Sequence, residues 1–105
     1  MDLENIQQRL REFARERDWE QFHSPKNLSM ALSVEVAELV EHFQWLTEPQ
    51  SSSAQAVDRE EVATEIADIQ IFLIMLANKL GVDIEQAVHA KIEANAIKYP
   101  PTVVS

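Results

Sequence analysis

The 105-residue chain has no cysteine and only one glycine. The lack of cysteine excludes disulfide bonds, thiolate catalysis and cysteine-ligated zinc sites. A single glycine with 46% apolar residues favours long helices over a turn-rich sheet. The longest apolar run, residues 71–77, is too short to span a membrane. The polar, charged N-terminal stretch is unlike a signal peptide, so we expect a cytoplasmic protein that does not bind membranes.

Basic residues are also scarce. Nine Lys and Arg residues stand against 18 Asp and Glu residues, which gives a formal net charge of −9. Such a chain is not expected to bind nucleic acid, because phosphate-backbone recognition needs a basic surface. It can still bind a small phosphate-bearing molecule if metal ions bridge the repulsion.

The spacing of apolar residues predicts a single all-α domain over residues 1–105. Ser24 and Pro25 are typical of a helix start, Asp83 with Gln86 resembles a capping box, and Gly81 is placed to end a helix. The stretch EPQSSSAQ reads as a loop, and Pro100-Pro101 stops the last helix. The expected helices cover residues 3–18, 25–47, 57–80 and 83–98, with an irregular stretch at 19–23 and a flexible tail at about 100–105.

Two carboxylate pairs occupy positions where apolar side chains are expected. At about 100° per residue, Glu35 falls within 60° of the leucines of its helix. Glu38 lies at the edge of that apolar stripe. Glu65 likewise falls among the apolar residues of the next long helix, with Asp68 about 60° away. Solvated carboxylates belong on the opposite face of such helices.

Buried, unpaired carboxylates cost several kcal/mol each, so these four need a partner or a proton. The central stripes of both helices hold no basic residue. Oxygen ligands from two facing helices suit Mg²⁺, with Mn²⁺ as a substitute. A buried salt-bridge network is the main alternative. A diiron centre is disfavoured, because the E-x-x-H motif that such bundles need twice occurs once, at Glu20 and His23.

Other residues permit both a functional and a structural interpretation. Lys91, Asn95 and Lys98 share one helix face that can neutralise phosphates or be an ordinary polar surface. Trp19, Phe22, His23 and Trp45 can stack on a base or pack in a core. Residues 71–77 make their helix apolar on all sides, which predicts a homodimer or larger assembly.

Four stretches in order, RDWEQFHSPKNL, EVAELVEHFQW, EIADIQIFL and KIEANAIKYP, resemble the MazG-like all-α nucleotide pyrophosphohydrolases, most closely the branch that hydrolyses dCTP. The resemblance implies a four-helix bundle completed by oligomerisation into a homodimer or homotetramer. It implies Mg²⁺ binding by Glu35, Glu38, Glu65 and Asp68, the same four carboxylates. It further implies substrate contacts from Trp19, His23, Lys26, Asn27, Trp45, Phe72, Lys91 and Asn95.

The chain departs from the family pattern in three places. Ala37 replaces a frequent glycine, Thr64 replaces a frequent glutamate, and Phe72 replaces a common tyrosine, whose hydroxyl Phe72 lacks.

The resulting hypothesis is hydrolysis of a nucleoside triphosphate, such as dCTP or a modified dCTP, to monophosphate and pyrophosphate. Glu38 or Glu35 would be the general base, and the role would be nucleotide pool cleansing. Alternatives are a silent helical dimer that binds nucleotides or a protein, and the related dUTP or phosphoribosyl-ATP hydrolases.

Overall fold

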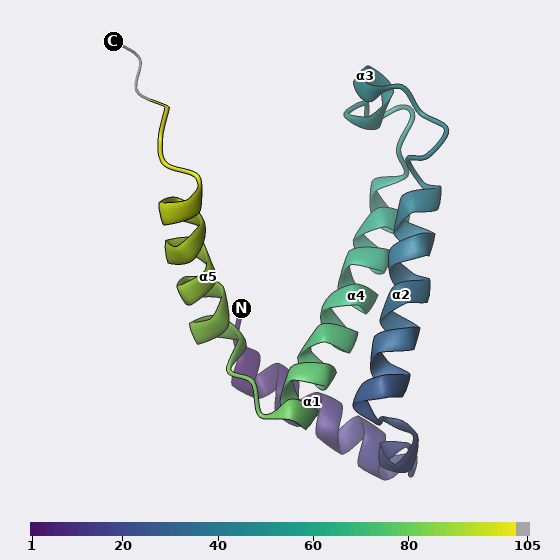
Figure 1. Cartoon of the computed structure of the whole chain (residues 1–105). Helices are drawn as coiled ribbons and strands as arrows, with labels where there is room; N and C mark the ends of the chain where they lie inside the picture. Colours follow the sequence, from purple (N-terminus) through teal and green to yellow (C-terminus); the bar gives the residue numbers. More distant parts are fainter. Residues whose placement is uncertain (103–105) are drawn as a thin grey trace.

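The computed structural model describes residues 1–102 and contains only helices and connecting segments over that range. The all-α prediction is confirmed, and the four long helices lie close to the expected positions (Figure 1). Residues 103–105 of the predicted tail lie outside the described part. The elements are α1 Leu3–Glu16, the 3₁₀ helix η1 Glu20–Phe22, α2 Pro25–Glu41, α3 Glu48–Ser51, α4 Arg59–Leu80 and α5 Ile84–Lys98.

A tight bend ends α1 and turns the chain towards α2. Asp18 takes a left-handed backbone conformation with φ of 55°. This allows the Trp19 N–H to donate to the Ala14 carbonyl at 2.9 Å, satisfying a carbonyl of the last helical turn. The amide of Asn27 donates through Nδ2 to the Phe22 carbonyl at 3.0 Å, which ties η1 to the first turn of α2.

The start of α2 follows the expected capping pattern. The Ser24 hydroxyl accepts a hydrogen bond from the Asn27 N–H at 3.1 Å, and Pro25 occupies the first turn.

The end of α2 differs from the prediction, because the helix stops at Glu41 rather than near Thr47. Thr47 instead caps the short helix α3, which lies within the stretch expected to be a loop. Its hydroxyl accepts from the Gln50 N–H at 3.3 Å, and the Gln50 side chain accepts from the Thr47 N–H at 2.9 Å. This reciprocal capping box fixes Thr47 in an extended conformation that a continuing helix cannot adopt.

Helix α4 is bounded by strong local signals. The Asp58 carboxylate accepts from the N–H groups of Glu60 and Glu61, and Gly81 ends the helix with φ of 68°. The Val82 N–H then donates to the Ala77 carbonyl at 2.8 Å. Helices α2 and α4 run side by side in opposite directions, and α1 crosses them at one end (Figure 1).

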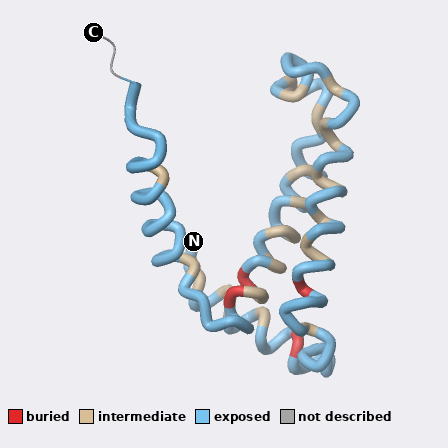
Figure 2. The backbone as a smooth tube through the Cα atoms, in the orientation of Figure 1, coloured by how far each residue is buried: buried red, intermediate tan, exposed pale blue. Residues whose placement is uncertain are grey.

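The buried core is small and lies at the end of the α2–α4 pair where α1 crosses it (Figure 2). It consists of Ala14, Leu28, Ile74 and Ala77. Helix α5 projects away from the other helices, and the Cα radius of gyration is 17.4 Å. A compact domain of this length has a radius of about 13 Å. The single chain is therefore an open, V-shaped molecule.

Many large apolar side chains remain exposed in this open chain. On α4, Ile66 is 48% exposed and Leu73 is 39% exposed, and on α5 Val88 and Ile92 are 50% and 58% exposed. Leaving a large apolar area in water is unfavourable, and such surfaces mark contacts with other molecules. These side chains favour the predicted self-association, which stays a prediction here.

No helix within residues 1–102 combines the length and the apolar character that crossing a membrane requires.

Gly81 offers a test of the backbone argument. A methyl group placed there would have no neighbour within 4 Å, so Gly81→Ala adds only the strain of a left-handed L-residue. We expect it to lower the free energy of unfolding by about 1 kcal/mol. Gly81→Asn should cost less, because asparagine tolerates this conformation. Chemical denaturation at one fixed protein concentration measures both, and an equal cost for the two variants would contradict the interpretation.

Candidate functional site

Helices α2 and α4 bring three glutamates together towards the α3 end of the pair. Glu35 and Glu38 lie one turn apart on α2, and Glu65 lies on α4. One carboxylate oxygen from each residue lies within 4.8 Å of the other two. The three residues therefore form a compact cluster of like charges between two helices.

Two of these carboxylates are partly withdrawn from water. The Oε2 atoms of Glu35 and Glu65 are buried, and neither has a hydrogen-bond donor among the described residues. The pKa of Glu35 is raised from 4.5 to about 7, and burial is the largest cause. A proton on Glu35 that is shared with Glu65 or Glu38 acts in the same direction, as do the negative charges of Glu38 and Asp68. Near neutral pH this site is therefore poised between holding a proton and holding another cation.

Asp68 belongs to the same neighbourhood without joining the compact group. It lies one turn after Glu65 on α4 and is half-buried. Its charge contributes to the raised pKa of Glu35, although its oxygens do not complete the 4.8 Å cluster. The structure thus gathers three of the four predicted ligands and places the fourth beside them.

The salt-bridge alternative finds no support in the part of the chain that the structure describes. The ion pairs found there join Arg17 to Glu16 at 3.7 Å and His89 to Glu85 at 3.9 Å. Neither pair involves the glutamate cluster. Buried carboxylates without basic partners are costly, and a divalent cation is the remaining simple counter-charge.

The donor set fits a hard cation. It consists of carboxylate oxygens on two helices, which is the ligand chemistry that Mg²⁺ and Mn²⁺ accept. The buried, unpartnered oxygens of Glu35 and Glu65 are where such an ion would find ligands already partly desolvated. Glu35, Glu38 and Glu65 can therefore hold a metal ion, with Asp68 within reach on the next turn.

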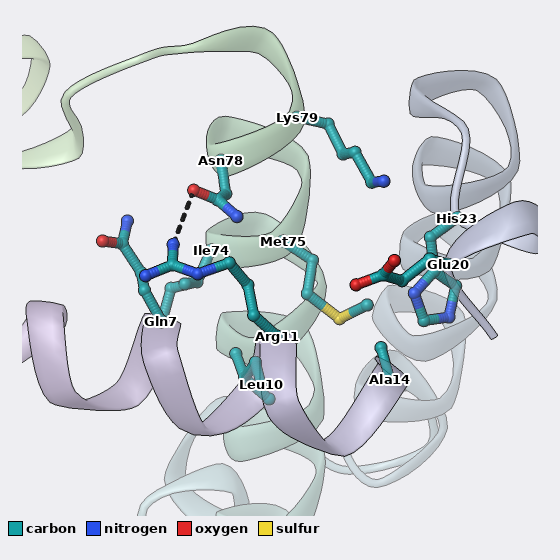
Figure 3. Close-up of a pocket in the computed structure, with 10 residues that line it drawn as sticks. All are labelled: Gln7, Leu10, Arg11, Ala14, Glu20, His23, Ile74, Met75, Asn78 and Lys79. Atoms are coloured by element: carbon teal, nitrogen blue, oxygen red, sulfur yellow. Dashed lines mark hydrogen bonds between the residues drawn. The ribbon is translucent and has the colours of Figure 1, made fainter. Parts of the chain in front are cut away.

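A separate pocket of about 170 Å³ lies where α1 and η1 meet the C-terminal half of α4 (Figure 3). Glu20 and His23 face Met75 across it, and Arg11 donates a hydrogen bond to Asn78 at 3.2 Å at its edge. The lining combines apolar side chains with polar and charged ones, as in ligand pockets. Its lining residues are Gln7, Leu10, Arg11, Ala14, Glu20, His23, Ile74, Met75, Asn78 and Lys79.

This pocket lies on the same face of α4 as part of the carboxylate site. Met75 follows Asp68 by seven residues, which is about two helical turns and about 10 Å along the axis. Of the residues predicted to contact substrate, His23 lines the pocket. Trp19 stands beside His23, with their ring centres 6.5 Å apart.

The other predicted substrate residues are dispersed in the single chain. Trp45 is 87% exposed and follows the far end of α2, about 25 Å from the end that carries His23. Lys91 and Asn95 lie on α5, which projects away from the α2–α4 pair. One copy of the chain therefore does not bring Trp45, Lys91 and Asn95 to the pocket of Figure 3.

The remaining three predicted residues lie on α2 and α4. Lys26 is exposed in the first turn of α2, and Asn27 there donates to the Phe22 carbonyl, a structural role. Phe72 is half-buried one turn after Asp68.

Sequence analysis missed several residues that line the pocket, including Arg11, Glu20 and Lys79. Arg11 and its partner Asn78 are 67 residues apart in the sequence, and no local sequence pattern predicts a contact between them. The E-x-x-H motif of Glu20 and His23 is a local signal at this pocket, but it indicates a metal site rather than a pocket lining.

The raised pKa of Glu35 predicts how stability depends on pH when no metal is present. Its folded-state pKa of about 7 exceeds the ordinary 4.5, so the fold favours protonated Glu35. That contribution is fully present below about 4.5 and is lost as the pH rises through about 7. Thermal unfolding with a chelator should show this loss in the wild type and a smaller one in Glu35→Gln. Mg²⁺ added at pH 8 should stabilise only the wild type. Parallel pH profiles for the two proteins would contradict the assignment.

Known proteins are similar to this chain over most of its length. The model of the MazG-like family matches residues 30–102. The dCTP pyrophosphatase 1 of Mus musculus is 46% identical over 100 residues, and that of Homo sapiens is 45% identical. These matches include 93% of this chain, and the chain spans 59% of the length of those relatives. The crystal structure of a pyrophosphatase from Archaeoglobus fulgidus matches with a TM-score of 0.87 and 39% identity, over 96% of this chain and 94% of that one. The chain therefore belongs to the MazG-like family, as its sequence motifs predicted.

Proposed function

We propose that this protein is a Mg²⁺-dependent nucleoside triphosphate pyrophosphohydrolase. It cleaves its substrate between the α and β phosphates and releases a nucleoside monophosphate and pyrophosphate. The observation that carries the proposal is the cluster of Glu35, Glu38 and Glu65, whose buried oxygens have no basic partner among the described residues. The similarity to pyrophosphatases over almost the whole chain supports the same reaction.

In this proposal Glu35, Glu38, Glu65 and Asp68 hold the metal. When bound, Mg²⁺ offsets the charge of the triphosphate and lowers the pKa of a water molecule that attacks the phosphorus. Glu38 serves as the general base that accepts the proton of this water, and Glu35 is the alternative. Both residues belong to the carboxylate cluster, which supports them as the base over acidic residues elsewhere.

The pocket of Figure 3 is proposed to receive the nucleoside. Its offset from the carboxylates along α4 is of the order of one nucleotide, so a bound triphosphate would point its base towards His23 and Met75. Trp19 beside His23 offers a flat face for stacking. The relatives named dCTP pyrophosphatase favour dCTP or a modified dCTP as the substrate, and nucleotide pool cleansing as the role.

A homodimer or homotetramer is part of the proposal. A two-fold pairing of α2–α4 hairpins in opposite directions would place Trp45 of one copy near Trp19 and His23 of the other. It would cover the exposed apolar residues of α4, and α5 of another copy could bring Lys91 and Asn95 to the phosphates. The open shape and the exposed Ile66 and Leu73 support such a pairing.

A catalytically silent nucleotide-binding or protein-binding dimer is the second candidate. The apolar surface suits any assembly, whether it is catalytic or not. All four predicted carboxylates are present, however, and three of them converge. The enzyme is therefore the better-supported function.

The reaction is tested by incubating the protein with Mg²⁺ and a panel of nucleoside triphosphates. Phosphorus NMR should show monophosphate and pyrophosphate in equal amounts, with dCTP or a modified dCTP turned over fastest. Glu38→Gln should lower kcat by at least about 100-fold, because it removes both a metal ligand and the base. Asp83→Asn, at the cap of α5 outside the site, is the matched control. Release of inorganic phosphate alone, or full activity of Glu38→Gln, would refute the proposal.

The contribution of the second copy is tested by mixing two impaired variants. Glu38→Gln lacks the base, and Trp45→Ala lacks the aromatic contact. If Trp45 acts on the partner's site, a mixed dimer contains one intact site, and random mixing restores about a quarter of the sites. Activity should therefore rise above the average of the separate variants after subunit exchange. No rise, with exchange verified by mass spectrometry, would place Trp45 outside the partner's site.

A further inference from the structure

Four side chains form a continuous row from the end of α1 to the pocket of Figure 3, and we call them the aromatic row. The guanidinium carbon of Arg17 lies 3.4 Å from the centre of the Phe13 ring. Phe13 meets Trp19 edge-to-face with ring centres 5.6 Å apart, and Trp19 meets His23 at 6.5 Å. His23 lines the pocket. The row therefore connects Arg17, which lies outside the lining, to the wall of the pocket.

Burial in the core does not fix the ring of Trp19. Trp19 is 44% exposed, and its neighbour Phe13 is 46% exposed. The backbone of Trp19 is held, because its N–H donates to the Ala14 carbonyl at 2.9 Å. Several staggered rotamers are open to a side chain that the core does not enclose. The contacts with the rings of Phe13 and His23 therefore have to select the orientation of Trp19.

Arg17 is joined to Phe13 at two points. Its guanidinium lies over the Phe13 ring, and its Nη1 donates to the Phe13 carbonyl at 3.1 Å. A planar guanidinium can stack on a ring and donate a hydrogen bond at the same time, which suits the compact ammonium of lysine much less. The ion pair of Arg17 with the exposed Glu16, at 3.7 Å, is a surface pair of little energetic weight. The main side-chain contacts of Arg17 are therefore with the aromatic row.

We propose that Arg17 is a positioning residue that holds Phe13, and through Phe13 the Trp19 ring, in the orientation from which Trp19 stacks on the nucleobase. The proposal rests on the proposed function, in which the nucleoside occupies the adjoining pocket. Stacking on the base is present in the bound substrate and in the transition state alike. Its weakening therefore raises KM and leaves kcat nearly unchanged.

A purely structural role for Arg17 makes a different prediction. Arg17 is the residue that follows the last turn of α1, where a cation interacts favourably with the helix dipole. Lysine supplies the same charge at that place, so Arg17→Lys would keep both the stability and the KM of wild type. In the positioning role, Arg17→Lys changes the stability little but raises KM. Chemical denaturation and kinetics on the same variants therefore separate the two roles.

The kinetic test uses the full chain, Mg²⁺ and the nucleoside triphosphate that wild type turns over fastest. Arg17→Lys should raise KM about fivefold and Arg17→Gln about tenfold, with kcat within about twofold of wild type. Arg15→Lys is the matched control and should behave as wild type. Arg15 lies in the last turn of the same helix, and the cation–π contacts within residues 1–102 do not include it. An unchanged KM in both Arg17 variants would overturn the proposal.

Fluorine NMR on protein labelled with 5-fluorotryptophan observes the positioning without turnover. The chain has two tryptophans, so Trp19→Phe identifies both signals. Without nucleotide, Arg17→Lys should shift and broaden the Trp19 signal and leave that of Trp45 unchanged. If Arg17→Lys does not fold, Phe13→Leu is the second variant, because it removes the ring that links Arg17 to Trp19 and should have the same effects. A Trp19 signal identical to that of wild type would overturn the proposal.

A double-mutant cycle separates positioning from direct contact between Arg17 and the nucleotide. In a Trp19→Ala background no ring is left to orient, so the addition of Arg17→Lys should not lower kcat/KM further. A further fall by the factor seen in wild type would show that Arg17 acts independently of Trp19, which would overturn the positioning role alone. Wild type that turns over no nucleoside triphosphate would instead refute the proposed function on which this role rests.

Discussion

The contact between α2 and α4 must hold several carboxylates where apolar side chains would otherwise pack. Glu35 and Glu65 each bury an oxygen without a donor among the described residues, and the pKa of Glu35 is raised to about 7. Bringing such charges together opposes folding unless a proton or a cation compensates them. The apolar residues that hold the helices together are accordingly concentrated at one end, at Leu28, Ile74 and Ala77. The acidic cluster lies nearer the opposite end of the pair, towards α3.

This arrangement explains the open shape of the single chain. A helix pair that uses its central face for carboxylates buries little apolar area within one copy, and its other faces remain exposed at Ile66 and Leu73. Helix α5 contributes Val88 and Ile92 to the exposed apolar surface and has little to pack against. Small domains depend on burying a large share of their surface, and in the proposed homo-oligomer other copies supply the missing burial. The proposed assembly and the proposed metal site thus have one origin in the sequence of α2 and α4.

The sequence predicts features whose causes are local. Asp58 and Gly81 mark the ends of α4 because capping and left-handed φ depend on a few neighbouring residues. The inward position of Glu35 and Glu65 follows from helical periodicity, which tertiary packing did not disturb. The pattern of Thr47 and Gln50 is that of a capping box and predicts a helix start there, whereas the polar composition of the surrounding stretch favours a loop. The pocket at Arg11 and Lys79 was not readable, since it depends on how α1 crosses α4.

The two tryptophans lie far apart in the single chain. Trp19 and Trp45 lie beyond opposite ends of a helix of about 25 Å, and the carboxylates lie between them. A nucleotide whose triphosphate is held at the centre can extend towards only one of these ends. In the proposed function the nucleoside occupies the pocket of Figure 3 at the end with His23, so Trp45 would make no contact with that nucleotide within its own chain. In a two-fold pair whose α2–α4 hairpins run in opposite directions, the Trp45 end of each copy would meet the His23 end of the other. The same exposed helix faces that need covering would then complete two equivalent sites, and catalysis would require the assembly that the apolar surface already favours.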